Sequence, residues 1–225
     1  MAPMIVIHHL NNSRSQRIVW LLEELGLPYR IEHYRRDPKT NLAPPALRAI
    51  HPLGKAPVIE DGGLVLAESG AIVEYLLDRY GEGKLAPRRG TPEHIRYLHW
   101  MHFAEGTLML HMLARLYLSR VGEPARALQA RVEGMLGAEL DLVEAELERG
   151  AHLAGAAFSA ADVQMAFPLE FASFAGLVVE RHGKVRDYLA RLQARPAYRR
   201  AVEKGGPYAF DAESAAAAAP FPLPR

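Results

Sequence analysis

The first eighty residues alternate between strand-like and helix-like hydrophobic patterns. Met4–Ile7 is a short apolar, β-branched run, and residues 29–34 alternate between apolar and polar, so both predict strands. Between them, apolar residues at helical spacing over 18–25 predict a helix that ends at Gly26. Two further strands, 57–60 and 64–66, flank an Asp-Gly-Gly hairpin turn, and residues 72–80 predict a second helix.

Beyond a Gly- and Pro-rich linker at residues 81–92, the strand patterns stop. Hydrophobic periodicity predicts helices over 93–120, 124–149, 159–176 and 183–204, with a kink at Pro168. The low-complexity end, 207–225, predicts a mobile tail. The chain therefore divides into an α/β unit at 1–82 and an all-helical unit at 92–206.

Composition narrows the classes of function. The net charge of +1 gives no reason to expect nucleic acid as a partner, and no apolar run is long enough for a membrane span. There is no cysteine, which excludes disulfides, thiolate-ligated metals and a catalytic protein thiol. We expect a cytoplasmic protein.

A small polar cluster, Asn12-Ser13-Arg14-Ser15, stands directly before the first helix. Ser and Asn are common helix caps, because their oxygens accept the free backbone N–H groups of the first turn. The same N–H groups and the helix dipole also attract anions. The cluster alone favours the cap and leaves an anion site open.

Two later segments carry the same ambiguity. In HPLGKAPV (residues 51–58), a proline opens a strand, which predicts an edge strand or a special backbone geometry such as a cis bond. An edge strand could pair with an extended peptide, although a simple turn also explains the segment. In LAESG (residues 66–70), Glu68 is either part of a helix cap or free to bind an amine.

Taken together, these segments resemble the cytosolic glutathione transferases. The resemblance covers residues 3–205 and rests on SRSQRIVWLLEELGLPY, HPLGKAPVIEDGGLVLAESGAIVEYL and FSAADVQMAFP in combination. The amino-acid sequence most resembles a fungal and bacterial subgroup of the family that includes a yeast transferase associated with the endoplasmic reticulum. The resemblance implies a thioredoxin-like α/β domain followed by an all-α domain, a homodimer, and glutathione as co-substrate.

The resemblance also implies roles for individual residues. In Ser-type branches, a serine at the start of the first helix stabilises the glutathione thiolate. Ser13 matches that serine, with Asn12 and Ser15 as alternatives. The residues expected to hold the rest of glutathione are Pro57 as the cis-proline, Val58 for the cysteinyl backbone, Glu68 and Ser69 for the γ-glutamyl end, and Lys55 and His51 for the glycyl carboxylate.

The second substrate, a hydrophobic electrophile, has a less distinct site in the sequence. On the helix predicted over 93–120, an apolar stripe contains Glu105, and His102 lies three residues earlier, at a spacing that allows the two to pair. We expect this pair to face the cleft, and we expect no metal, because no H-E-x-x-H spacing is present. Ser159 and Asp162 form an S-x-x-D capping box with a structural role.

Two other functions remain open at this stage. A glutathione-dependent disulfide reductase without a protein thiol is compatible with the absence of cysteine. A non-catalytic binding protein of the same fold would bind glutathione without activating it. The leading prediction is a glutathione transferase, with peroxide as a further possible electrophile. The loop before the first helix contains no tyrosine, which excludes a Tyr-type mechanism.

Overall fold

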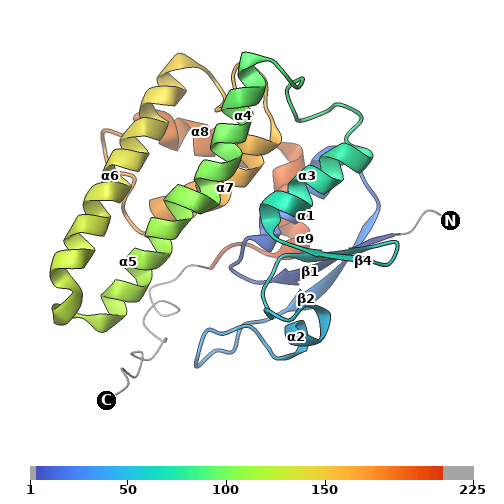
Figure 1. Ribbon diagram of the computed structural model, residues 1–225, viewed down its shortest axis with the longest axis horizontal. Coiled ribbons are helices and arrows are strands. Elements are labelled where there is room, and N and C mark those ends of the chain that lie inside the picture. Colours follow the sequence, from blue (N-terminus) through green and yellow to red (C-terminus); the bar gives the residue numbers. More distant parts are fainter. Residues whose placement is uncertain (1–3, 210–225) are drawn as a thin grey trace.

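The structure, a computed structural model, describes residues 4–209 and has a sheet-containing half and a helical half (Figure 1). The four strands are β1 (Ile5–Leu10), β2 (Tyr29–Tyr34), β3 (Val58–Asp61) and β4 (Leu64–Ala67), in the order β2-β1-β3-β4. β2 runs parallel to β1, whereas β3 is antiparallel to both β1 and β4. The predicted α/β fold of the first half is confirmed.

The helices of this half follow the hydrophobic pattern, with one exception. α1 (Ser15–Leu25) ends before Gly26, as predicted, and this glycine adopts a left-handed conformation; α3 is Ser69–Tyr80. The short helix α2 (Ala46–Ile50) was not predicted. Its five residues are too few to show a helical hydrophobic period, so the sequence pattern could not reveal it.

The expectation of an edge strand after Pro57 is wrong. β3 is an interior strand, paired on both sides, and the edges of the sheet are β2 and β4. The other expectation for this segment holds, because the Ala56–Pro57 peptide bond is cis. The proline lies just before the strand, so it removes no donor from the interior of the ladder.

The second half of the chain contains only helices within the described residues. They are α4 (Pro92–Phe103), a π-helical turn η1 (Ala104–Leu108), α5 (Met109–Val121), a short 3₁₀ turn η2 (Glu123–Ala125), α6 (Arg126–Arg149), α7 (Ala160–Phe174), α8 (Gly183–Gln193) and α9 (Pro196–Gly205). The all-α prediction is confirmed. α7 begins at the predicted Ser159–Asp162 capping box and continues through Pro168.

Two of the predicted helices differ in detail. The helix expected over 93–120 is interrupted by η1, and the helix expected over 183–204 is two helices, α8 and α9. Arg195 has an extended backbone at this break. The ring of Pro196 disfavours a helical conformation in the residue before it, so the proline ends one helix and opens the next.

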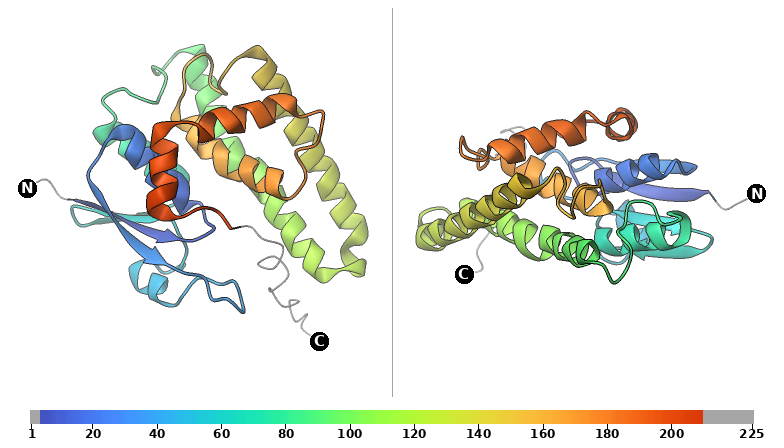
Figure 2. Two further views of the ribbon diagram at one scale, coloured as in Figure 1. Left: turned by 180° about the vertical axis from the view of Figure 1, so that it is seen from behind. Right: turned by 90° about the horizontal axis from the view of Figure 1, so that it is seen from above.

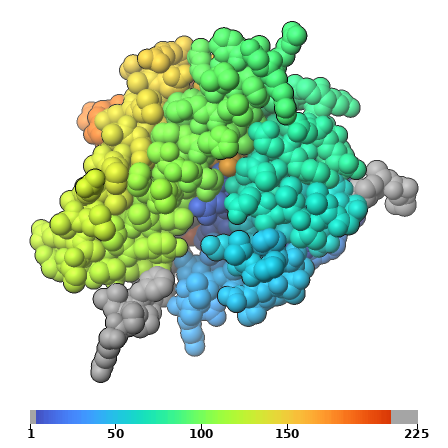
Figure 3. Space-filling model, in the orientation of Figure 1, coloured from blue at the N-terminus to red at the C-terminus, as the bar shows by residue number. Residues whose placement is uncertain are grey.

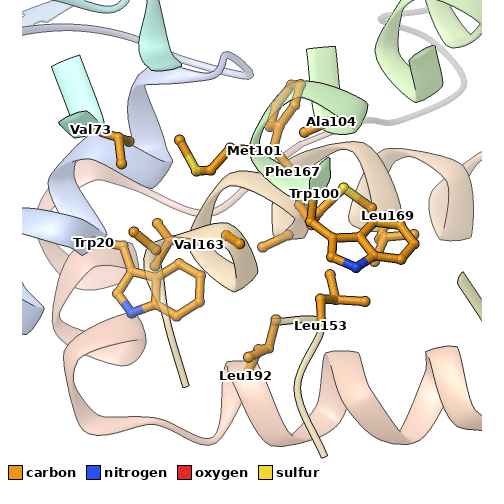
Figure 4. Packing of buried hydrophobic residues seen from close by; sticks show 14 of the residues in the cluster. Trp20, Val73, Trp100, Met101, Ala104, Leu153, Val163, Phe167, Leu169 and Leu192 are labelled. Atoms are coloured by element: carbon orange, nitrogen blue, oxygen red, sulfur yellow. The ribbon is translucent and has the colours of Figure 1, made fainter. Parts of the chain in front are cut away.

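The two halves share a hydrophobic core. Figure 4 shows Trp20 and Val73 of the first half close to Met101, Val163 and Phe167 of the second. α9 returns from the helical half and packs along α1 (Figure 2). At this contact the Gln16 side chain donates to the Ala201 carbonyl at 2.8 Å, so the start of α1 is held from both sides.

The end of the described chain also returns to the first half. The Ala209 backbone donates to and accepts from the Asn12 side chain at 2.8 Å each, and the Tyr208 ring packs on Phe167 of α7, with 5.5 Å between the ring centroids. The rest of the tail predicted over 207–225 lies outside the described residues. None of the helices within residues 4–209 combines the length and apolar composition needed to cross a bilayer.

Candidate active site

The strand register brings the three predicted site segments to one end of the sheet. His8 of β1 lies opposite Val58 of β3, and Val58 lies opposite Ala67 of β4. The polar cluster at residues 12–15 follows β1, and Glu68 follows β4 directly. Figure 3 shows a hollow between the two halves, with atoms of the early, dark blue part of the chain at its floor. The sheet thus assembles segments that are far apart in sequence.

The polar cluster does not form an ordinary helix cap. The N-cap of α1 is Arg14, which makes no side-chain capping hydrogen bond. Ser13 Oγ instead accepts the Ser15 backbone N–H at 3.2 Å and lies 2.7 Å from Ser15 Oγ. The hydroxyl is therefore held at the N-terminal end of α1, where free N–H groups and the helix dipole favour negative charge.

The side chains of the other two candidates, Ser15 and Asn12, are hydrogen-bonded to other parts of the protein. Ser15 is fully buried, and its Oγ contacts the backbone N–H and carbonyl of Leu10 as well as His9 Nδ1. Asn12 is tied to the backbone of Ala209, with its amide donating and its carbonyl oxygen accepting at 2.8 Å each. Of the three, Ser13 keeps the most freedom to meet a ligand.

Glu105 pairs with Arg17 of α1 and with Arg14, the N-cap residue of that helix, and not with His102. Arg14 Nε donates to one carboxylate oxygen at 2.7 Å, and Arg17 donates to the other. Arg17 is almost fully buried, and its burial lowers the pKa of the guanidinium while Glu105 opposes that shift. The three side chains join the helical half to the floor of the cleft.

The predicted His102–Glu105 pair is therefore wrong. His102 is exposed on α4, whereas Glu105 lies in the π-helical turn that follows. The wider winding of a π turn breaks the regular i, i+3 relation. A permanently charged guanidinium is also a stronger partner for a carboxylate than a histidine is.

The residues expected to bind glutathione differ in their exposure and geometry. Glu68 is exposed, with a backbone φ of 69°, a strained conformation for a residue other than glycine that is often found at functional sites. Ser69 is buried, and Val58 is buried in the sheet. Lys55 is exposed, and His51 accepts the backbone N–H of Leu53 at 3.4 Å.

Gln164 of α7 is a site residue that the sequence did not reveal. Its side-chain amide donates to Ser69 Oγ at 3.4 Å, and its backbone carbonyl accepts from Arg17 at 2.7 Å. It thereby links α3 and α1 from the helical half. A buried glutamine within an apolar helix was the available signal, because buried polar side chains require partners.

No group of three His, Cys, Asp or Glu side chains within residues 4–209 is arranged to hold a metal ion. The polar groups at this end of the sheet are instead hydroxyls, a carboxylate and cations. Such a set can bind a small molecule that carries both negative and positive groups.

Comparison with known proteins agrees with the resemblance found in the sequence. The family descriptions "Glutathione S-transferase, N-terminal domain" and "Glutathione S-transferase, C-terminal domain" match residues 2–78 and 99–196. Glutathione S-transferase 3 of Schizosaccharomyces pombe is 36% identical over 216 residues, which cover 89% of this chain and 88% of the relative.

Solved structures extend the comparison to the fold. A glutathione S-transferase from Actinobacillus pleuropneumoniae superposes with a TM-score of 0.84 at 34% identity, covering 94% of this chain and 99% of that one. A sphingomonad glutathione S-transferase solved in complex with glutathione has the same fold, with a TM-score of 0.74 at 23% identity, over 89% and 98% of the two chains. The chain belongs to the glutathione S-transferase family.

Proposed function

We propose that this transferase binds glutathione at the end of the sheet where β1, β3 and β4 meet, and activates it as a thiolate beside Ser13. One observation carries the proposal. The register sets the cluster after β1, the cis-prolyl segment before β3 and the start of α3 at one end of the sheet. In this arrangement the residues just before β3 meet the cysteinyl backbone, because Val58 itself is paired with His8 and Ala67 in the sheet, and Glu68 and Ser69 hold the γ-glutamyl end.

The energy needed for activation is within the reach of this site. Lowering a thiol pKa by about two units needs roughly 2.7 kcal/mol. A hydrogen bond to a charged acceptor contributes about 1.5–3 kcal/mol, and a helix N-terminus adds about 0.3–1 kcal/mol. One hydroxyl at the start of α1 therefore suffices, without a basic side chain in contact with the sulfur.

The thiolate then attacks the carbon of a hydrophobic electrophile in the hollow between the two halves, and the carbon's leaving group departs as an anion. With a peroxide, the thiolate attacks one oxygen, the O–O bond breaks to release an alcohol, and a second glutathione converts the resulting sulfenic acid to glutathione disulfide and water. The proposal places this reaction in the cytoplasm, where reduced glutathione is available. It also includes a homodimer. Leu53, Leu64 and Val65 are large apolar residues exposed on the first half, and a second subunit would cover such residues.

The test is a pH titration of the thiolate absorbance of glutathione bound to wild type and to Ser13→Ala. We expect a bound thiol pKa well below that of free glutathione in wild type, and a return toward the free value in Ser13→Ala. Ser119→Ala, an exposed serine on α5, is the matched control and leaves the thiol pKa unchanged. Bound glutathione that titrates normally in wild type would overturn activation and favour a non-catalytic binding protein.

A further inference from the structure

A chain of buried polar groups runs from Ser13 into the first half of the molecule. Ser13 Oγ lies 2.7 Å from Ser15 Oγ, and Ser15 Oγ lies 2.9 Å from His9 Nδ1. The other ring nitrogen, His9 Nε2, lies 2.9 Å from the carbonyl oxygen of Gly205 at the end of α9. All three side chains are 5% exposed or less. Each hydroxyl and the neutral imidazole has a single proton to donate, so only a few arrangements of donors and acceptors satisfy this chain.

The last link fixes the tautomer of His9. A carbonyl oxygen only accepts hydrogen bonds, so Nε2 carries the proton and donates it to Gly205. Burial lowers the pKa of His9 to about 4, against a smaller opposing effect of the Gly205 carbonyl, and His33, whose ring packs edge-on at 5.7 Å, lowers it further. The imidazole is therefore neutral at neutral pH, and its Nδ1 is an acceptor.

The tautomer of His9 in turn fixes the direction of both hydroxyls. Nδ1 can only accept from Ser15, so the single hydroxyl proton of Ser15 is committed to His9. Ser15 Oγ is then an acceptor toward Ser13, and the short contact between the two oxygens requires Ser13 to donate. Ser13 Oγ also accepts the Ser15 backbone N–H, which leaves one lone pair and no proton for a ligand.

We propose that His9 is a positioning residue of the sulfur site: acting through Ser15, it sets the direction in which the Ser13 hydroxyl donates. This inference rests on the proposed role of Ser13 toward glutathione. With glutathione absent, Ser13 donates into the protein and offers a lone pair that suits an S–H donor. When the thiol proton leaves to solvent, Ser13 turns its own proton to the thiolate and gives up its bond to Ser15.

If the acceptor at Nδ1 is removed, the Ser15 proton can turn to Ser13 Oγ at 2.7 Å, a closer partner than the Leu10 carbonyl at 3.2 Å. Ser13 is then an acceptor from Ser15 and is free to donate to the sulfur without losing a bond. Removal of the His9 acceptor therefore strengthens the thiolate state, whereas general damage to the site would weaken it.

Two substitutions separate the two ends of the imidazole. In His9→Gln, the amide group occupies the position of Nε2, so the bond to Gly205 can persist while the acceptor at Ser15 is lost. In His9→Asn, the amide oxygen occupies the position of Nδ1, so the acceptor at Ser15 persists while the bond to Gly205 is lost. His8→Asn is the matched control, because His8 is equally buried on β1 but binds Glu60 and Tyr34 on the opposite face.

The measurement is the thiol pKa of bound glutathione in each variant, with circular dichroism to confirm folding. We expect His9→Gln to lower the thiol pKa by about one unit, the size of one freed hydrogen bond, and His9→Asn and His8→Asn to match wild type. Ser15→Ala breaks the chain at its middle and gives a second test of the same sign if His9→Gln does not fold. A thiol pKa that is unchanged or raised in His9→Gln or Ser15→Ala, or lowered equally in His9→Asn, overturns the inference.

The double variant Ser13→Ala/His9→Gln distinguishes this inference from the proposed function. If Ser13 transmits the effect, His9→Gln lowers the thiol pKa only while Ser13 is present. A Ser13→Ala protein whose bound thiol titrates as in wild type removes the proposed function itself. A raised thiol pKa in Ser13→Ala, combined with no decrease in His9→Gln, removes only the role of His9.

Discussion

The two halves of the molecule contribute to the site in different ways. The sheet-containing half supplies the groups expected to touch glutathione, all within a few residues of a strand end or a helix start. The helical half supplies Glu105 and Gln164, which act on those groups through arginines and a serine of the first half. The first half carries the groups expected to contact glutathione, and the helical half positions those groups.

This difference has an energetic basis. The hydroxyls at the start of α1 form short-range contacts, which cost little to order and add little stability individually. The pair between Arg17 and Glu105 crosses the domain boundary and is almost fully buried on the arginine side. A buried charge is expensive without its partner, so this contact should matter more for stability than for chemistry.

The largest expected effect therefore comes from Glu105→Leu. It leaves the Arg17 guanidinium buried without a carboxylate, and we expect a loss of about 3 kcal/mol in the free energy of unfolding, measured by urea denaturation. The double variant Arg17→Met/Glu105→Leu should recover much of this loss, because it removes both charges. If Glu105→Leu unfolds at the same urea concentration as wild type, the pair does not hold the two halves together.

The second prediction concerns the buried His9 of the first half. Its pKa in the folded protein, about 4, lies below the unfolded value of about 6.5, so the unfolded chain binds the extra proton more readily. The stabilising effect is present above about pH 6.5 and is lost as the pH falls toward about 4. Between about pH 7 and about pH 5, wild type should lose about 2 kcal/mol more stability than His9→Asn. Equal losses in the two proteins would show that His9 is not held neutral by burial.

The third prediction tests a polar motif of the helical half that resembles a site. Ser159 and Asp162 form a capping box, and Asp162 also accepts from Leu153 N–H at 3.1 Å and Tyr188 Oη at 2.7 Å. Ser159→Ala should cost about 1 kcal/mol of stability and leave the thiol pKa of bound glutathione unchanged. A shifted thiol pKa would contradict the purely structural role.

The sequence predicted the sheet-containing half well because its signals are local. Alternating strands, the Asp-Gly-Gly hairpin and the helix end at Gly26 each depend on a few neighbouring residues. The π-helical turn at Ala104–Leu108 has no such local signature, and the partner of Glu105 lies about ninety residues away, as the separations of 88 and 91 positions to Arg17 and Arg14 show. Pairings of this kind depend on how the two halves pack, which one sequence does not specify.

The smallest predicted effect of the helical half on the site is the change in glutathione affinity when Gln164 is replaced. Its amide donates to Ser69 at the long distance of 3.4 Å, so it orients the serine that we propose holds the γ-glutamyl end without carrying much energy itself. Gln164→Met keeps the size of this side chain and should weaken glutathione binding about threefold by calorimetry, since a weak neutral hydrogen bond contributes about 0.5–1 kcal/mol.

The control for Gln164→Met is Gln193→Met on α8, which loses a shorter amide bond, to Glu170 at 3.0 Å, away from Ser69. Gln193→Met should bind glutathione as wild type does. A tenfold or larger loss of affinity in Gln164→Met would mean that the helical half contacts glutathione directly. It would contradict the view that this half only positions residues of the first half. An unchanged affinity would leave Glu105 as the only polar side chain of the described helical half that acts on the site.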